Sequence, residues 1–466
     1  MSAVKKITIV ATAVAVIGVV AVGGVFAYKL AGNDASDLAA LVPSDAVAFV
    51  SVTLDPKADQ KLKFNNLLNR AEKNGGESLG FKSSDVSIDV LLDKASETCN
   101  MTEREWVGDS FGVAVVPAKT SSETPSVVGV VPDNTGSEMP SFVYISSKDD
   151  ASAKKFVKEV LGSNTPNCSI LSATVVDDWV VLGSVIGSTD ALPTDGSKSL
   201  ANNKSFSSDT ASLKDQGLLT YWVDVNAPSL LKSAGTSSEQ LKGIDSAFGT
   251  VRATDNSIES FNHISVVTPF KTVGTIGNVL KAIPSESTGV IAFAGIKDVN
   301  VLTTSFAQVL RDISGALDPS VDNTQAKSVA KLFASPGALA VSGTPEAPKG
   351  AFYTEATVQV AKAATAQASL FMFDKPSDDL FVNRTIGNII ELTLPSIATA
   401  PTGTGSVVDT QGFKDAVGDY SKSVALAYIS ADLFDETGIS GVFTGASLNA
   451  AQVNGGVDVT FRVGIK

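Results

Sequence analysis

The sequence is poor in histidine and cysteine, with one histidine and two cysteines in 466 residues. The histidine, His263, stands in Phe261-Asn-His-Ile-Ser265, a run that alternates like a strand. A Ser/His/Asp or Cys/His hydrolase would have to use this side chain, and no Gly-x-Ser-x-Gly elbow accompanies it. We therefore interpret His263 as structural or merely exposed, and we assign no catalytic residue. The same three side chains offer no zinc-ligand spacing, so we expect no metal and no cofactor.

The two cysteines, Cys99 and Cys168, are far apart in the sequence. In an exported protein they permit one disulfide, which would stabilise the fold by constraining the unfolded chain. The alternative is two separately buried thiols. Spacing does not decide between the two, so both interpretations stay open.

Positive charge is also scarce, with 36 Lys and Arg against 49 Asp and Glu, a net charge of −13 and a pI near 4.7. Nucleic-acid phosphates demand basic patches, so this balance argues against a nucleic-acid partner. It also argues against the body lying flat on anionic lipid. The acidity itself is typical of a soluble surface.

No charged residue occurs from Ile7 to Tyr28. A transmembrane helix needs roughly 20 apolar residues, and this run is long enough. Lys5 and Lys6 precede it, which favours a cytoplasmic N-terminus and an extracytoplasmic body. Residues 1–37 are therefore predicted to hold a cytoplasmic tip, a single-pass anchor and a short tether. A cleaved signal peptide ending near Val25-Phe26-Ala27 is the alternative, and it exports the body as well.

An internal repeat organises the body. Leu41–Asp55 and Ala282–Asp298 share Pro-Ser and an acid, then a β-rich apolar run, then an Asp before a helical segment. Later in each half a phenylalanine precedes an apolar strand, and the spacing from Phe206 to Tyr221 equals that from Phe413 to Tyr428. Both halves close with paired strands around suitable turn dipeptides, Asp255-Asn256 and Asn454-Gly455. We predict two homologous halves, 38–272 and 273–466.

Each half mixes strands joined by tight turns with amphipathic helices, such as Lys61–Lys73 and Asp150–Leu161. Further strands are expected at Phe111–Val116, Ala338–Ser342 and Gly350–Val360, and a helix at Ala361–Leu370. A doubly wound parallel sheet would need stricter alternation and would not end in hairpins. The predicted fold class is therefore α+β, with a mainly antiparallel sheet and helices packed on it in each half.

Four acids stand at repeat-equivalent positions: Asp55 with Asp298, and roughly Asp224 with Asp432. Each falls where a strand gives way to a helix or loop. An Asp at such a place accepts hydrogen bonds from the free N–H groups of the following helix. We interpret the four as helix caps, the alternative being paired acid/base carboxylates facing one another across a cleft.

Three short motifs carry a family resemblance: Pro43–Pro56 directly after the apolar run, Trp106-Val-Gly-Asp109 before Ser-Phe-Gly-Val-Ala-Val, and Phe206 with Tyr221-Trp-Val-Asp224. The chain resembles a bacterial, largely actinobacterial, membrane-anchored family catalogued as domain of unknown function number thirty-three fifty-two. Trp106, Gly108 and Asp109 form its second landmark, with a turn role expected for Asp109. In the second half Phe333-Ala-Ser-Pro336 takes that place. The resemblance implies an anchored extracytoplasmic protein and supplies no catalytic residues.

Three functions are compatible with these observations. The preferred one is a non-enzymatic binding or scaffolding module at the cell envelope, whose partner is an unknown envelope protein or lipid. The second is a carrier or chaperone for an apolar ligand such as an envelope lipid, which requires an apolar cavity. The third is a carboxylate-based hydrolase, which requires two acids roughly 5–9.5 Å apart.

Overall fold

A computed structural model of the chain describes residues 35–53, 58–76, 105–117, 141–162, 172–183, 192–193, 196–213, 217–227, 244–266, 271–298, 323–344, 347–364, 382–393 and 404–466. These residues form two compact units that divide between Val267 and Thr268. We call them the N-terminal unit (35–72 and 76–266) and the C-terminal unit (271–466 with 73–75). The predicted anchor, Ile7 to Tyr28, lies outside the described residues, and within these no helix has the length and apolarity to cross a membrane.

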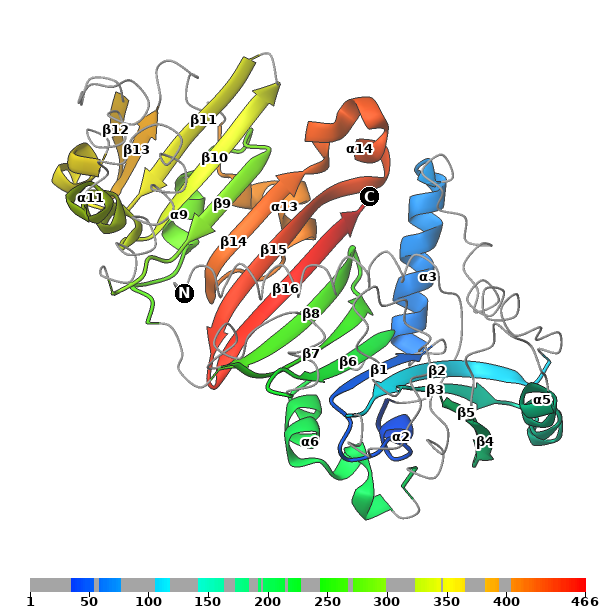
Figure 1. Cartoon of the computed structure of the whole chain (residues 1–466). Coiled ribbons are helices and arrows are strands. Elements are labelled where there is room, and N and C mark those ends of the chain that lie inside the picture. The colour runs from blue at the N-terminus through cyan, green and yellow to red at the C-terminus, as the bar shows by residue number, and fades with distance from the viewer. Residues whose placement is uncertain are drawn as a thin grey trace, which may run out of the picture. The chain divides into compact units, whose positions relative to one another are not determined.

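The N-terminal unit is an antiparallel sheet with helices (Figure 1). Its sheet order is β8-β7-β6-β1-β2-β3-β5-β4. The strands are β1 (Ala48–Thr53), β2 (Val107–Val115), β3 (Ser141–Ser147), β4 (Ser172–Val176), β5 (Trp179–Gly183), β6 (Leu219–Asp224), β7 (Ile244–Ala253) and β8 (Ser257–Val266). The helices are α2 (Ala35–Ala39), α3 (Ala58–Lys73), α5 (Asp150–Gly162), η3 (Gly196–Lys198), η4 (Leu200–Asn202) and α6 (Lys204–Ala211).

The C-terminal unit has the same architecture, with sheet order β16-β15-β14-β9-β10-β11-β13-β12. The strands are β9 (Gly289–Phe293), β10 (Gly337–Thr344), β11 (Ala347–Thr354), β12 (Val382–Ile386), β13 (Ile389–Thr393), β14 (Ser423–Ser430), β15 (Phe443–Val453) and β16 (Gly456–Ile465). The helices are α9 (Gly277–Ala282), α11 (Asn323–Phe333), a helix at 358–364, η6 (Val407–Asp409), α13 (Gln411–Val417), η7 (Ala431–Thr437) and α14 (Ile439–Val442). The α+β class predicted from the sequence is confirmed.

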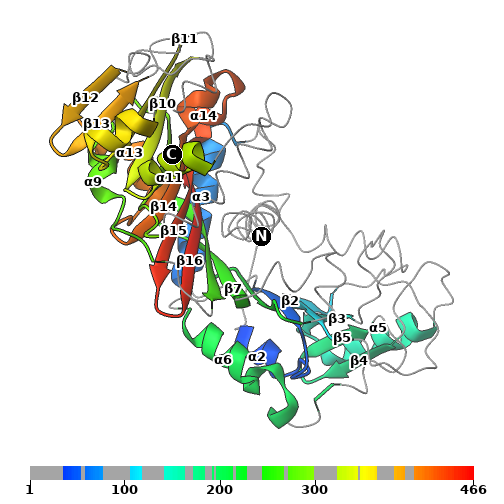
Figure 2. The same ribbon diagram turned by 60° about the vertical axis from the view of Figure 1, so that its left-hand side comes forward.

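Strands alternate their side chains between two faces, and different helices cover the two faces. In the N-terminal unit, Phe49, Phe142 and Trp222 share a core with Leu200 and Phe206 from η4 and α6. The opposite face packs on α5, which lies beside β4 in Figure 2, through a core that contains Trp106, Ile145, Phe156, Val160, Val180 and Leu182. The predicted helix at Asp150–Leu161 matches α5 because its apolar positions Ala153, Phe156 and Val160 follow helical spacing and are all buried.

The C-terminal unit repeats this two-sided packing. Val290, Ala292, Ala338 and Leu426 from the strands pack on one face against α9 and α13, represented by Leu280 and Phe413. Ile390 and Leu392 pack on the other face with Leu332 of α11 and with Ala361 and Ala364 of the helix at 358–364. This second set covers the end of the sheet formed by β11, β13 and β12.

Two predicted elements need correction. The strand expected over Gly350–Val360 ends at Thr354, and the helix expected from Ala361 already begins at 358. The closing strand expected before the Asn454-Gly455 turn begins as early as Phe443, because residues Gly445 to Asn449, which are small or polar except for Leu448, pair with β14. Weak apolar alternation hides such a segment from a pattern search.

Helices α6 and α13 begin at matching caps. The Asn203 Oδ1 accepts hydrogen bonds from the backbone N–H groups of Ser205 and Phe206, at 3.0 and 3.2 Å. The Thr410 hydroxyl accepts one from the N–H of Phe413 at 3.3 Å. Each cap thus fixes the helix start that carries a core phenylalanine.

Substituting Asn203→Ala is expected to lower the free energy of unfolding by about 1 kcal/mol, because two helix N–H groups lose their acceptor. The amide of Asn203 also donates to the Ser44 carbonyl at 3.0 Å, which adds to the loss. Urea denaturation measures the change. Asn203→Ser keeps a capping oxygen without placing a carboxylate against the Ser44 carbonyl, so it serves as the matched control; a loss as large as that of the alanine variant would contradict the capping role.

Candidate functional site

Three of the acids and thiols predicted from sequence, Asp55, Cys99 and Cys168, lie outside the described residues. Asp298 follows β9 and is exposed. Asp224 ends β6, and its Oδ1 accepts a hydrogen bond from the N–H of Asn226 at 3.0 Å. Asp224 therefore closes a turn of its own backbone, as Asp side chains commonly do.

The proposed equivalence of Asp224 and Asp432 is wrong. Val47 directly precedes β1, and Thr288 directly precedes β9. The carbonyl of Val47 accepts from the N–H of Asp224, whereas the carbonyl of Thr288 accepts from the N–H of Ser430. The Ser430 hydroxyl accepts from the N–H of Asp432 at 3.3 Å, so a serine performs in the C-terminal unit the turn role of Asp224.

The same one-residue shift affects the tyrosines. Phe49 of β1 pairs with Trp222, whereas Val290 of β9 pairs with Tyr428. Trp222 rather than Tyr221 is thus the register counterpart of Tyr428. Their equal spacing from the preceding phenylalanine made Tyr221 and Tyr428 look equivalent. The distance from Phe206 to Trp222 is in fact one residue longer than the distance from Phe413 to Tyr428.

The Trp106-Val-Gly-Asp109 motif anchors α5 to β3. The Trp106 ring packs on Phe156 with centroids 4.6 Å apart, and its carbonyl accepts from the N–H of Lys148 at 2.9 Å. A Cβ at Gly108 would approach the Ser146 hydroxyl to 2.6 Å, so only glycine fits there. Asp109 is exposed and lies within strand β2, so the turn role expected for it is wrong, and the register of β2 against β3 shifts around it. Trp106, Gly108 and Asp109 therefore serve packing and strand register and do not converge on one site.

His263 lies on β8 opposite Phe248. The two rings are 4.9 Å apart at their centroids, and His263 is half-buried. Its ring thereby extends the aromatic face that includes Trp222 and Phe248. This placement gives the ring a packing role on the sheet.

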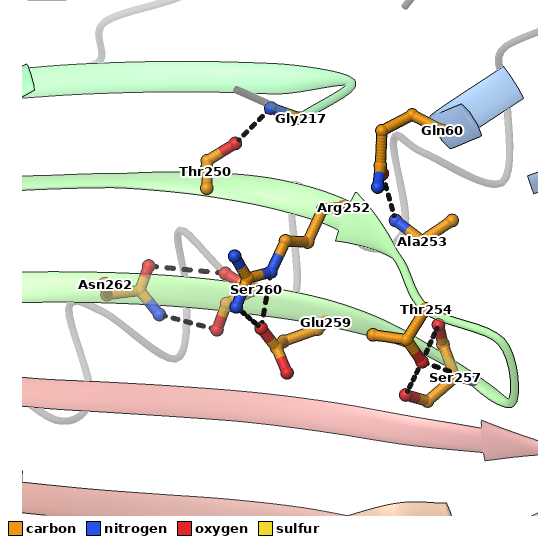
Figure 3. Close-up of polar contacts among 10 residues, drawn as sticks. All are labelled: Gln60, Gly217, Thr250, Arg252, Ala253, Thr254, Ser257, Glu259, Ser260 and Asn262. Atoms are coloured by element: carbon orange, nitrogen blue, oxygen red, sulfur yellow. Dashed lines mark hydrogen bonds and ion pairs between the residues drawn. The ribbon is translucent and has the colours of Figure 1, made fainter. Parts of the chain in front are cut away.

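The β7–β8 hairpin of the N-terminal unit carries a group of polar contacts (Figure 3). Arg252 and Glu259 face each other across the two strands, and the Arg252 Nε donates to the Glu259 Oε1 at 2.7 Å. Glu259 is only 1% exposed. The Arg252 guanidinium also lies 5.8 Å from the Phe261 ring centroid. A charge buried so deeply requires such a partner.

On the opposite face of the hairpin lies a second buried set, Tyr221, Ser260 and Asn262. The Tyr221 hydroxyl donates to the Asn262 Oδ1 at 2.6 Å, and the Asn262 amide donates to the Ser260 carbonyl at 3.1 Å. Burial raises the pKa of Tyr221 above its ordinary value. Gly249 leaves room for this set, since a Cβ there would lie 2.9 Å from the Tyr221 ring.

The hairpin is tied to its surroundings by further bonds in Figure 3. The Gln60 Oε1 of α3 accepts from the N–H of Ala253 at 2.9 Å, and the Thr250 hydroxyl accepts from the N–H of Gly217 at 2.9 Å. The polar groups of Figure 3 bind one another, which fixes the hairpin. Among the residues that the structure describes, no three His, Cys, Asp or Glu side chains gather as a metal site would need.

The C-terminal unit has its own row of ionisable groups across β11, β13 and β12. Tyr353 pairs with Glu391, which pairs with Arg384, and Arg384 donates to the Glu391 Oε2 at 2.8 Å. Burial first, and then the negative charge of Glu391, raise the pKa of Tyr353.

The surface feature that stands out lies on β9 and β10. Ile291 and Leu339 are register partners, with Val341 two residues further along β10 on the same face. Their exposed fractions are 58%, 44% and 40%. We call these three side chains the β9–β10 face. It adjoins the core under α11, because Leu339 also pairs with Phe352, which packs against that core.

Exposed large apolar side chains are unevenly shared between the units. In the described residues the N-terminal unit has Leu62 and Leu161, and the C-terminal unit has Val273, Ile291, Leu339, Val341, Val358, Leu433 and Phe434. Adjacent exposed aliphatic residues indicate a surface that meets another molecule. The sequence did not predict this exposed surface, because a strand with apolar residues on both faces has the pattern of a fully buried strand.

Fold and surface together define an α+β protein whose two units are each built on antiparallel strands, with exposed aliphatic side chains on one unit. The chain belongs to the family described as "Protein of unknown function (DUF3352)", whose model matches residues 8–334. No curated protein matches it. One similar solved structure, "Structure of crystal form III of TP0453", shares 7% identity over 49% of this chain and 78% of that one, with a TM-score of 0.21.

Proposed function

We propose that this chain is a membrane-anchored extracytoplasmic protein whose body is a non-enzymatic binding module at the cell envelope. The observation that carries the binding role is the β9–β10 face, where adjacent aliphatic side chains are exposed on a sheet. Lining up such residues on a folded surface has a cost in solubility, which a binding function offsets. The anchor rests on the uncharged run from Ile7 to Tyr28 and the lysines before it.

The body is proposed to have arisen by duplication of one α+β unit, giving homologous halves at 38–272 and 273–466. The identical strand order of the two units supports this. Matching backbone bonds support it further: Pro43 bridges to Ser199 as Pro284 does to Ser406. The N–H groups of Leu200 and Val407 donate to the carbonyls of Val42 and Ile283.

The binding role is favoured over carboxylate catalysis by the contacts of three described acids. Glu259 and Glu391 are each held by an arginine, and Asp224 binds its own turn. General acid/base work instead needs a carboxyl group free to exchange a proton with substrate.

The anchor can be tested by alkaline carbonate extraction and protease treatment of intact cells and of inverted membrane vesicles. We expect the full chain to stay with the membrane and to be digested only from the extracytoplasmic side. Deleting residues 7–28 should leave the body in the cytoplasm. A carbonate-soluble protein whose N-terminus maps just after Ala27 would instead show signal-peptide cleavage and would contradict the anchor.

A further inference from the structure

We infer that the β9–β10 face docks on an anionic membrane surface, so that the C-terminal unit lies against the bilayer. This rests on the proposed function, because an anchored body with a short tether stays near lipid. The predicted tether, from Lys29 to Leu38, is about ten residues and reaches at most roughly 35 Å when extended.

The shape of the face suits a bilayer. Gly289 and Gly350 are the register neighbours of Val341 on either side, and Ala427 is that of Ile291. The aliphatic side chains therefore project from a surface of small residues. The exposed side chains at its centre are all aliphatic, whereas protein interfaces gain most affinity from Trp, Tyr and Arg.

Charge points to an anionic surface. Helix α11 covers the adjoining end of the same face, since its Phe333 stacks on Phe293 at 4.9 Å and lies 5.8 Å from Phe352. Lys327 and Lys331 are exposed on α11, and their i, i+4 spacing places them on one side of the helix. Helix α11 contains no acidic residue. The whole chain has a net charge of −13, so a lysine pair beside the aliphatic surface gives this region a local positive charge that is opposite to the charge of the chain.

This local reversal changes the earlier expectation that the acidic body avoids anionic lipid. Screening limits the influence of distant carboxylates to about a Debye length, roughly 8 Å at physiological salt. Lysines next to the contact therefore dominate it.

The test uses the full chain reconstituted in vesicles of equal parts phosphatidylglycerol and phosphatidylcholine, or of phosphatidylcholine alone. A photoreactive residue is introduced as Leu339→p-benzoyl-phenylalanine, and lipid adducts are quantified by mass spectrometry after irradiation. The same residue at Leu62, exposed by 62% in the N-terminal unit, is the matched control. We expect phospholipid adducts at position 339 in anionic vesicles and few at position 62.

Each lysine near an anionic surface contributes about a fivefold preference, so Lys327→Gln with Lys331→Gln should weaken docking by up to about thirtyfold. Equal adduct yields at positions 339 and 62, yields independent of lipid charge, or adducts to a second copy or another protein would overturn the inference. Adding the protein to preformed vesicles and separating bound protein by flotation repeats the measurement without inserting the anchor into the bilayer. The two experiments therefore distinguish failure of the anchor from failure of the docking face.

Discussion

Arg252→Ala is expected to lower the free energy of unfolding of the N-terminal unit by about 3 kcal/mol, because it leaves the Glu259 carboxylate buried without its charge partner. Glu259 is 1% exposed and receives the Arg252 guanidinium directly. The loss of the arginine stem over the Phe261 ring adds to the effect. Tryptophan fluorescence reports on this unit alone, since Trp106, Trp179 and Trp222 all lie within it.

Arg384→Ala is the matched control in the other unit. Arg384 is also paired across a hairpin with a buried glutamate, but its side chain is 57% exposed. Water screens that pair, so we expect a loss of only about 1 kcal/mol. Because that unit has no tryptophan, hydrogen exchange with mass spectrometry of peptides from β12 and β13 follows its unfolding.

The double change Arg252→Met with Glu259→Leu removes the charge and keeps the volume, and should recover most of the stability lost by Arg252→Ala. If Arg252→Ala costs no more than Arg384→Ala, burial of the glutamate is not what makes the pair important. If the double variant is as unstable as Arg252→Ala, packing and not charge accounts for the loss.

These ion pairs carried a signal in the sequence. Arg252 and Glu259 are equally distant from the Asp255-Asn256 turn, and Arg384 and Glu391 are equally distant from Gly387-Asn388. Once a two-residue turn is located, positions equidistant from it face each other across the hairpin. The turn at Asp255-Asn256 was predicted, but the Arg252–Glu259 contact that it implies was not drawn from it.

Strands and helices with strong periodicity were predictable within a few residues. The Ile170–Ser184 region gives β4 and β5 around Asp177-Asp178 because Asp177, with a φ of 49°, takes the left-handed turn conformation that Asp tolerates. Elements with small or polar residues were not predictable to the same degree. The early part of β15, from Gly445 to Asn449, is defined by pairing with β14 rather than by its own pattern.

The candidate site was the least predictable part. Ile291 and Leu339 have the composition of core residues, and their equivalents Val50 and Val113 are likewise register partners. Val50 and Val113 are half-buried and are therefore less exposed than Ile291 and Leu339. Which face of a strand receives a covering helix depends on connections distant in sequence, and no local pattern records it.

Phe413→Ala is expected to lower the free energy of unfolding of the C-terminal unit by about 3–5 kcal/mol. Phe413 is fully buried and holds α13 on the sheet, with its ring 5.1 Å from Tyr428 and 5.7 Å from Tyr420. The cavity left by the ring would be lined by side chains from α13 and β14, so hydrogen exchange should rise first in those two elements. Hydrogen exchange with mass spectrometry therefore measures both the size and the place of the change.

Phe206→Ala is the counterpart in the N-terminal unit, where the ring lies 5.6 Å from Phe49 and 5.7 Å from Trp222. If the two units descend from one ancestor and use this phenylalanine alike, the loss should be of the same size and visible in tryptophan fluorescence. Leu433→Ala, at a position 42% exposed, should change stability by less than about 0.5 kcal/mol. If the Phe413→Ala variant is as stable as Leu433→Ala, α13 does not depend on this ring. If Phe206→Ala is destabilised and Phe413→Ala is not, the two phenylalanines are not energetically equivalent, and this support for homologous halves is lost.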